Sequence, residues 1–195
     1  MINRIVSGIV LAFAFSALPA AAAAPDKGVD VTIRTTAGQI VVHLETAKAP
    51  VTTRNFLKYV DGHLYDNASF YRVLPPDSSG PANAPGVIQG GLGPSGTHRL
   101  PSIPVESTKT TGLHNTSGAI AMARTNDPNS ANSEFFICVG DDSYLDGQNS
   151  QDGVGYAVFG KVVKGYDVVL KIQHSPSIGD QLHPPVKILS IRRNH

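Results

Sequence analysis

The chain has 195 residues, with 16 Lys and Arg against 15 Asp and Glu. This near balance gives no electrostatic reason to expect nucleic acid or an anionic membrane as a partner. Cys138 is the only cysteine, which excludes an internal disulfide and leaves stability to packing. The length suits one domain with a sizeable core.

The first 24 residues have the three-part pattern of a secretory signal peptide. Arg4 supplies the positive charge of the N-terminal region, an apolar stretch follows over 5–18, and small residues over 20–24 offer cleavage sites. The apolar stretch is shorter than the roughly 20 residues that a spanning helix needs. We therefore expect residues 1–24 to be removed as a signal peptide and residues 25–195 to form one domain. The mature protein is expected to be exported, periplasmic or secreted, with no membrane contact.

Strand-like and turn-like segments dominate the remaining chain. Alternating apolar residues predict a hairpin of strands at 29–35 and 39–44. Pro50 and the apolar spacing after it predict a helix that ends near Gly62. Pro, Gly, Ser and Asn over 75–85 indicate a loop. Further strands are predicted at 69–74, 87–89, 103–105, 118–123, 135–139, 158–163 and 186–191, and a second helix at 166–173. This pattern indicates an all-β barrel or sandwich, and closure of a barrel leaves no exposed edge.

Two glycine-rich stretches have the spacing of nucleotide-binding motifs but lack their context. Residues 91–96 read G-x-G-x-x-G, yet no helical period follows. Residues 155–161 resemble a P-loop, but Val162 stands in place of the Ser or Thr that holds magnesium. The sequence also lacks H-E-x-x-H and G-x-S-x-G, which excludes the common zinc protease and serine hydrolase patterns. Cys138, in an apolar strand, is expected to be a buried small hydrophobe.

A series of short motifs runs in a fixed order through most of the chain. They are Ser69–Pro75, Val87–Gly91, Gly118–Arg124, Ser133–Ile137, Tyr144–Gly147 and Tyr156–Val162. Together they resemble the cyclophilin family of peptidyl-prolyl isomerases over nearly all of residues 29–193. The insert Gly153-Val154-Gly155 resembles the bacterial exported branch of that family. The resemblance implies a mainly β fold, a closed eight-stranded antiparallel barrel capped by two α-helices, with an active groove on its outer face. It also implies that no metal or cofactor takes part.

Rotation about an X–Pro bond needs neither a nucleophile nor net proton transfer. Amide resonance sets a barrier of ~18–20 kcal/mol, and X–Pro bonds exchange over roughly 10–100 s. A catalyst must bind the twisted amide better than either planar form. Two kinds of group are required, a fixed donor near the proline nitrogen and an apolar slot for the ring.

The resemblance implies which residues supply these groups. Arg72 matches the catalytic arginine, and its guanidinium is a permanently charged fork of donors. Gln89 matches a position that contacts the substrate backbone, and Phe136 matches a position in the proline pocket. Alternation places Phe135 and Phe136 on opposite faces of their strand, one toward the barrel and one toward the groove. The remaining substrate-binding positions implied are Val87, Ala123, Arg124, Glu134, Tyr144, Leu145 and Tyr156. Without the motifs, Arg72 and Arg124 would be read as surface charges and the apolar residues as core.

The chain departs from the family at three places. Glu134 stands where the family usually has Gln, and a carboxylate accepts but cannot donate. Glu134 is expected either to lose a substrate contact or to pair with Arg72, which would fix the guanidinium or compete with substrate for it. Residues 76–85 resemble an insertion, and Gly86 stands where an aromatic pocket residue is expected. Tyr144 replaces the frequent tryptophan, so only weak cyclosporin binding is expected.

These observations leave three alternatives open. The first is an active isomerase that acts as a monomer on proline-containing polypeptides and assists their folding. The second is a proline-peptide binding module or chaperone on the same fold with little turnover, which Glu134 and the missing aromatic favour. The third is an unrelated enzyme or structural β-domain.

Overall fold

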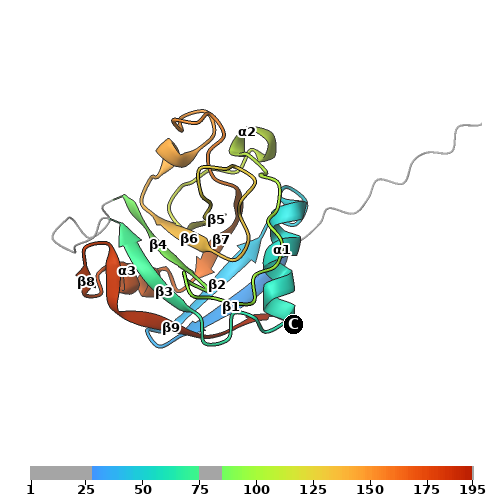
Figure 1. Cartoon of the computed structure of the whole chain (residues 1–195). Coiled ribbons are helices and arrows are strands. Elements are labelled where there is room, and N and C mark those ends of the chain that lie inside the picture. The colour runs from blue at the N-terminus through green and yellow to red at the C-terminus, as the bar shows by residue number, and fades with distance from the viewer. Residues whose placement is uncertain (1–27, 75–84, 195) are drawn as a thin grey trace, which may run out of the picture.

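The computed structural model describes residues 28–74 and 85–194, and within them nine strands form one antiparallel sheet (Figure 1). The strands are β1 (Val29–Thr35), β2 (Gln39–Leu44), β3 (Ser69–Leu74), β4 (Gly86–Gly91), β5 (Ala119–Met122), β6 (Phe135–Val139), β7 (Val158–Lys164), β8 (Ser177–Ile178) and β9 (Gln181–Arg193). Their order is β1-β2-β7-β5-β6-β4-β3-β9-β8, and β1 also pairs with β9. The eight strands from β1 round to β9 therefore close into a barrel, and β8 is a two-residue addition at β9.

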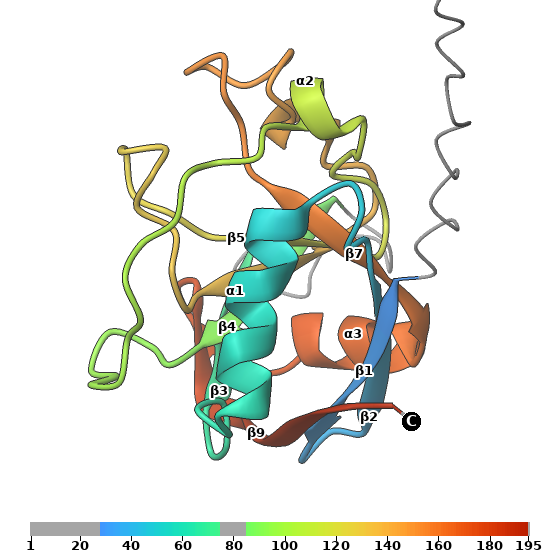
Figure 2. The ribbon, with the colours of Figure 1, turned by 90° about the vertical axis from the view of Figure 1, so that its right-hand side faces the viewer.

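Strand alternation fills the barrel interior. On β1 and β2, Val31 lies opposite Val42 and Ile33 opposite Ile40, and all four side chains are fully buried. On the other side of β1, Ile33 lies opposite the buried Ile191 of β9. The end of β9 runs beside β1 in Figure 2 as well. The hairpin predicted from the alternation is thus the seam at which the barrel closes.

Two helices cover the two ends of the barrel. Helix α1 (Pro50–Asp61) begins at a proline, whose missing N–H needs no partner in the first turn. It sends Phe56 and Tyr59 into the core, and α3 (Tyr166–Gln173) sends Val169 and Ile172. The two helices lie at opposite ends of the barrel (Figures 1 and 2). Because both insert apolar side chains between the strands, the core is continuous from end to end.

The fold agrees with the predicted eight-stranded barrel and its two capping helices, with some changes of detail. The structure adds a four-residue helix α2 (Thr108–Thr111) and a 3-10 turn η1 (Ser143–Leu145). The strand predicted at 103–105 is wrong. Only an isolated bridge joins Ile103 to Ala131, because the flanking Pro104 has no N–H to continue a ladder.

Some predictions fall partly or wholly outside the described residues. The expected signal peptide at 1–24 does so entirely, and the expected loop at 75–85 does so apart from its last residue. Within residues 28–74 and 85–194, no helix combines the length and apolar character needed to cross a bilayer.

Candidate active site

Strand β6 separates two apolar clusters. All five of its residues are buried, although they face alternate sides of the sheet. Phe135, Ile137 and Val139 belong to the barrel core, whereas Phe136 and Cys138 belong to a second cluster outside the barrel. The predicted division of the two phenylalanines is therefore confirmed, with Phe136 on the outer face. Burial raises the pKa of the Cys138 thiol well above its usual range, so this cysteine is an inert packing residue.

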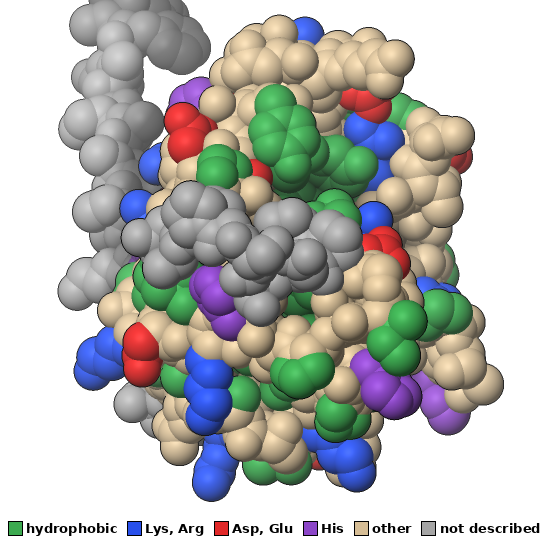
Figure 3. All heavy atoms as spheres, turned by 90° about the vertical axis from the view of Figure 1, so that its left-hand side faces the viewer, with side chains coloured by type: hydrophobic (Ala, Val, Ile, Leu, Met, Phe, Trp, Pro, Cys, Tyr) green, Lys and Arg blue, Asp and Glu red, His purple; other side chains and the backbone are tan. Residues whose placement is uncertain are grey.

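A pocket of about 180 Å³ opens over this second cluster. Its lining comprises Arg72, Leu74, Val87, Gln89, Ala123, Arg124, Phe136, Tyr144, Leu145 and Tyr156. Figure 3 shows hydrophobic side chains gathered in a hollow on one face of the molecule, with basic and acidic side chains at its edge. The structure thus brings together every predicted site residue except Glu134, which lies outside the lining.

A β-bulge places the polar residues of β3. Phe70 pairs with Gly90 and Arg72 pairs with Gln89, so Tyr71 is an extra residue on β3. Plain alternation would put Phe70 and Arg72 on one face. The bulge instead leaves Phe70 fully buried in the barrel core while Arg72 lines the pocket. It also turns Tyr71 and Arg72 toward the same partner, Gln89.

The polar side chains form a hydrogen-bonded chain across two strands, β3 and β4, and two loops. Arg72 donates from Nε to Asp180 Oδ2 at 2.6 Å and from Nη1 to Gln89 Oε1 at 3.1 Å. Gln89 donates from Nε2 to the Tyr71 hydroxyl at 2.9 Å, and this hydroxyl donates to Glu134 Oε2 at 2.8 Å. The side chains of Arg72 and Gln89 are therefore held in place before any substrate arrives.

Glu134 does not pair with Arg72, contrary to one of the two expectations. Its carboxylate accepts instead from Arg99 Nη1 at 3.1 Å, the Ser133 hydroxyl at 2.8 Å and the Gly93 amide at 3.3 Å, besides Tyr71. The bulge explains the difference, because Tyr71 stands between the two groups. Burial and the neighbouring Glu134 raise the pKa of Tyr71 well above its usual range, which keeps the hydroxyl neutral as a donor.

Arg124 supports the wall of the pocket rather than extending into it. Its side chain is only 6% exposed and pairs with Asp152, while Nε and Nη2 donate to Gly155 O at 3.1 and 2.9 Å. The guanidinium carbon lies 4.7 Å from the centre of the Tyr156 ring, in cation–π geometry. Tyr156 in turn meets Phe136 edge to face at 5.4 Å. Arg124 thereby fixes the aromatic wall of the pocket.

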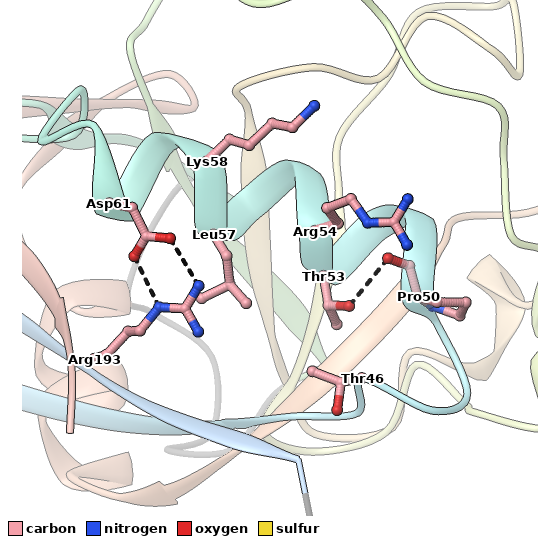
Figure 4. A pocket seen from close by; sticks show the side chains of 8 residues that line it. All are labelled: Thr46, Pro50, Thr53, Arg54, Leu57, Lys58, Asp61 and Arg193. Atoms are coloured by element: carbon pink, nitrogen blue, oxygen red, sulfur yellow. Dashed lines mark hydrogen bonds and ion pairs between the residues drawn. The ribbon is translucent and has the colours of Figure 1, made fainter. Parts of the chain in front are cut away.

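Other hollows lie on the described surface. One of about 470 Å³ adjoins the pocket and shares Arg124, Tyr144, Leu145 and Tyr156 with it. A second, of about 310 Å³, runs along α1, where the Asp61–Arg193 ion pair closes one end (Figure 4). No predicted site residue lines this second hollow. Among residues 28–74 and 85–194, no three His, Cys, Asp or Glu side chains gather in a way that could hold a metal ion.

Sequence reasoning missed several residues at or behind the groove. Leu74, which lies opposite Val87, lines the pocket, and its place in the strand motif could have indicated this. Tyr71 lies beside Arg72 in that motif, but only the bulge turns it to the groove. Asp180 and Asp152 lie in turns far along the chain, and no motif marks them.

The comparisons with known proteins agree with this geometry. The sequence model of the family described as cyclophilin type peptidyl-prolyl cis-trans isomerase/CLD matches residues 29–193. A peptidyl-prolyl cis-trans isomerase of Acinetobacter baylyi is 39% identical over 168 residues, which cover 83% of this chain and 84% of the relative. Peptidyl-prolyl cis-trans isomerase A of Dickeya dadantii is 36% identical and covers 98% of this chain and 96% of its own.

Solved structures show the same fold. The crystal structure of a cyclophilin type isomerase of Cryptosporidium parvum, determined in the presence of the dipeptide Ala-Pro, has a TM-score of 0.69 at 23% identity. The match covers 85% of this chain and 99% of that one. The family match, the bacterial relatives and the barrel together show that the chain belongs to the cyclophilin-type peptidyl-prolyl cis-trans isomerases and is an enzyme of that class.

Proposed function

We propose that the protein catalyses cis–trans exchange of X–Pro bonds in exported polypeptides, with Arg72 stabilising the twisted amide. The observation that carries the proposal is that Arg72 lines one pocket together with Phe136 and Val87. Its guanidinium is already fixed by two hydrogen bonds, to Gln89 and to Asp180. A charged donor that is fixed in advance costs no reorganisation when the amide twists.

The proposed mechanism follows from the loss of resonance on twisting. The lone pair of the proline nitrogen becomes localised, and a donor from Arg72 stabilises it. Val87, Phe136, Leu145 and Tyr156 hold the ring while the preceding carbonyl swings. Gln89 orients Arg72 and offers polar atoms to the substrate backbone. No bond forms or breaks, so the residues supply position and charge alone.

The proposed export rests on the pattern of residues 1–24, with a positive start, an apolar stretch and small residues at the end. Removal of this segment would leave a mature chain that acts as a monomer in the periplasm or outside the cell. The test is the N-terminal sequence and mass of the protein recovered from each cell fraction of its producer. Recovery of the intact leader on protein in the cytoplasm would refute the proposal.

A catalytically weak proline-peptide binding module or chaperone remains the second candidate. Gly86 favours it, because a residue without a side chain stands where a pocket aromatic is expected. The fixed guanidinium of Arg72 favours the isomerase, since a module that only binds proline gains nothing from a charge aimed at the nitrogen.

Substitution of Arg72 tests the mechanism. Arg72→Ala should lower kcat/KM by about 10²-fold or more, the scale of losing one fixed donor to the transition state. Arg34→Ala on β1 is the matched control, because Arg34 is an exposed strand arginine away from the groove. Exchange rates from NMR on one Ala-Pro peptide provide the measurement. A near-normal rate in Arg72→Ala with an unchanged melting curve would favour the binding module instead.

A further inference from the structure

The catalytic arginine has an acidic partner that no sequence motif marks. Asp180 Oδ2 accepts from Arg72 Nε at 2.6 Å, across 108 residues of sequence. We infer that Asp180 is a positioning residue for the isomerisation, holding the guanidinium of Arg72 at the angle from which it reaches the twisted amide. The inference rests on the catalytic role proposed for Arg72.

The backbone of Asp180 is held in place by the turn in which it lies and by a hydrogen bond to β3. Asp180 lies in the two-residue turn between β8 and β9, where Ile178 pairs with Gln181. Gly179 takes the positive φ of 59° that such a tight turn requires at its first position. The amide of Val73 on β3 donates to the carbonyl of Asp180 at 2.9 Å. The turn is therefore bonded to the strand that carries Arg72.

The side chain of Asp180 is fixed as well. Its second oxygen, Oδ1, accepts from Gln181 Nε2 at 2.8 Å. The neighbouring Arg72 holds the pKa of the Asp180 carboxyl below its usual range, so the group is charged at neutral pH. Each carboxylate oxygen thus has a donor, and the carboxylate presents a fixed acceptor to Nε of the arginine.

Two separate bonds fix the plane of the guanidinium. Asp180 binds Nε from the β8–β9 turn, while Gln89 binds Nη1 from β4. The guanidinium is planar, and residues from different elements hold two of its nitrogens. It therefore cannot rotate freely about the bonds of the arginine side chain. Loss of Asp180 would leave only the neutral bond to Gln89. The arginine would then sample other rotamers, and the charge would leave the position in which it stabilises the amide.

The ion pair is too exposed to be explained by stability alone. The Arg72 and Asp180 side chains are 34% and 36% exposed. Exposed ion pairs contribute little to folding stability. Removal of the carboxylate should therefore change the reaction rate far more than the melting temperature. This contrast separates a positioning role from a merely structural one.

The chain supplies a matched control away from the groove. Asp61 on α1 accepts from Arg193 Nε at 2.8 Å and Nη2 at 2.7 Å, and Figure 4 shows the pair closing the hollow along the helix. These side chains are 52% and 37% exposed, so this pair is somewhat more exposed than the inferred one. Asp61→Asn therefore removes the same kind of charge contact without touching the groove.

The experiment measures kcat and KM for Ala-Pro exchange, with melting curves, in Asp180→Ala, Asp180→Asn, Arg72→Ala, Arg72→Ala/Asp180→Ala and Asp61→Asn. Asp180→Ala is expected to lower kcat and kcat/KM together by about 10- to 100-fold, the scale of misplacing a catalytic group by roughly 1 Å. Asp180→Asn keeps an acceptor oxygen and should lose less. In the Arg72→Ala background, Asp180→Ala should cause no further loss, because its effect passes through the arginine.

The outcomes distinguish the two proposals. A normal rate in Asp180→Ala beside a slow Arg72→Ala would overturn the inference and leave the proposed function standing. A normal rate in Arg72→Ala would remove the catalytic arginine and the inference with it. Additive losses in the double variant, or a loss in Asp61→Asn equal to that in Asp180→Ala, would show a structural effect and also overturn the inference.

Discussion

At the scale of single residues, Glu134 is the departure from the family that the structure explains best. Its carboxylate accepts from Tyr71, Arg99, Ser133 and the Gly93 amide. A glutamine offers one acceptor oxygen and one donor group in the same space. The four donors around residue 134 therefore require a carboxylate. We therefore expect Glu134 to act on the groove through Tyr71 rather than on the substrate.

Glu134→Gln should for that reason lower kcat/KM by a few-fold, on the scale of ~1 kcal/mol for one hydrogen bond. The amide group would face donors, and Tyr71 would lose the acceptor that orients its hydroxyl toward Gln89. Exchange kinetics on one Ala-Pro peptide give the measurement. Glu106→Gln serves as the control, because Glu106 accepts from the Val51 and Thr52 amides at the start of α1. A faster Glu134→Gln enzyme would mean that a direct donor to substrate matters more than the fixed tyrosine.

Tyr144 is the second residue-scale departure, and it governs the expected response to cyclosporin. Tyr144 is 56% exposed and lines the pocket. A tyrosine hydroxyl and an indole N–H present their donors from different positions. Tyr144→Trp should strengthen cyclosporin binding by about tenfold, corresponding to ~1.4 kcal/mol for one restored hydrogen bond. Calorimetry on both proteins is the test, and equal affinities would contradict the assignment.

At the scale of elements, the turn η1 carries Tyr144 and Leu145 and rests on a buried acid. Asp142, which precedes the turn, has no exposed surface. Within the described residues, neither of its carboxylate oxygens has a hydrogen-bond partner. Burial raises its pKa to about 7, the Cys138 thiol and the Val139 amide offset part of the rise, and the nearby Asp141 adds to it. The Cys138 thiol lies close to Asp142. Neither Cys138 nor Asp141 supplies a positive charge to the carboxylate.

Asp142 should make stability fall as pH rises from about 4 to about 7. Its folded pKa of about 7 exceeds the unfolded value of 3.8, so the folded state binds more protons in this window. The stabilisation is complete below pH 4 and lost above pH 7. Asp142→Asn should remove this dependence of stability on pH. It should also raise the melting temperature at pH 8 by roughly 2–10 °C, since a buried polar group without a hydrogen-bond partner costs ~1–3 kcal/mol.

Melting curves of wild type and Asp142→Asn across pH 4–8 provide the test. Asp141→Asn is the matched control, because Asp141 is exposed and its Oδ1 accepts from the Ser143 amide, as an asparagine oxygen also can. If the melting temperatures of wild type and Asp142→Asn change equally with pH, Asp142 does not titrate between pH 4 and pH 8.

At the scale of the whole molecule, the barrel depends on one long-range closure. The first strand, β1, pairs with the last, β9, so the two ends of the described domain complete the sheet. Ile33 and Ile191 lie opposite each other at this seam, and both are fully buried. Strand β9 pairs with β1 at this seam and also with β3, the strand that carries Arg72.

Ile191→Ala should therefore destabilise the whole fold by about 2–5 kcal/mol, the usual cost of a cavity in a packed core. Leu189 stands two residues earlier on the same strand and is 47% exposed. Leu189→Ala should cost less than about 0.5 kcal/mol. Urea unfolding of both variants checks the difference. Leu189 is exposed because the pairing with β1 skips it, with Arg34 opposite Ser190 and Thr35 opposite Ile188. Similar losses would show that Leu189 and Ile191 do not face opposite sides of the sheet.

The sequence by itself determined most of the barrel and nearly all of the pocket. Alternation located Val31, Ile33 and their partners, because side chains in a strand must face alternate sides. Helical spacing located α1, and the ordered motifs identified nine of the ten residues that line the pocket. These features are local, so neighbouring residues are enough to specify them.

Only the tertiary structure decided which polar groups meet. Strict alternation would place Phe70 and Arg72 on one face, but the bulge opposite Gln89 sends Phe70 into the core and Arg72 to the groove. The pairing of Arg72 with Asp180 depends on a turn 108 residues away, which β9 brings alongside β3. Such partners depend on strand register and chain closure, and no short stretch of sequence contains either.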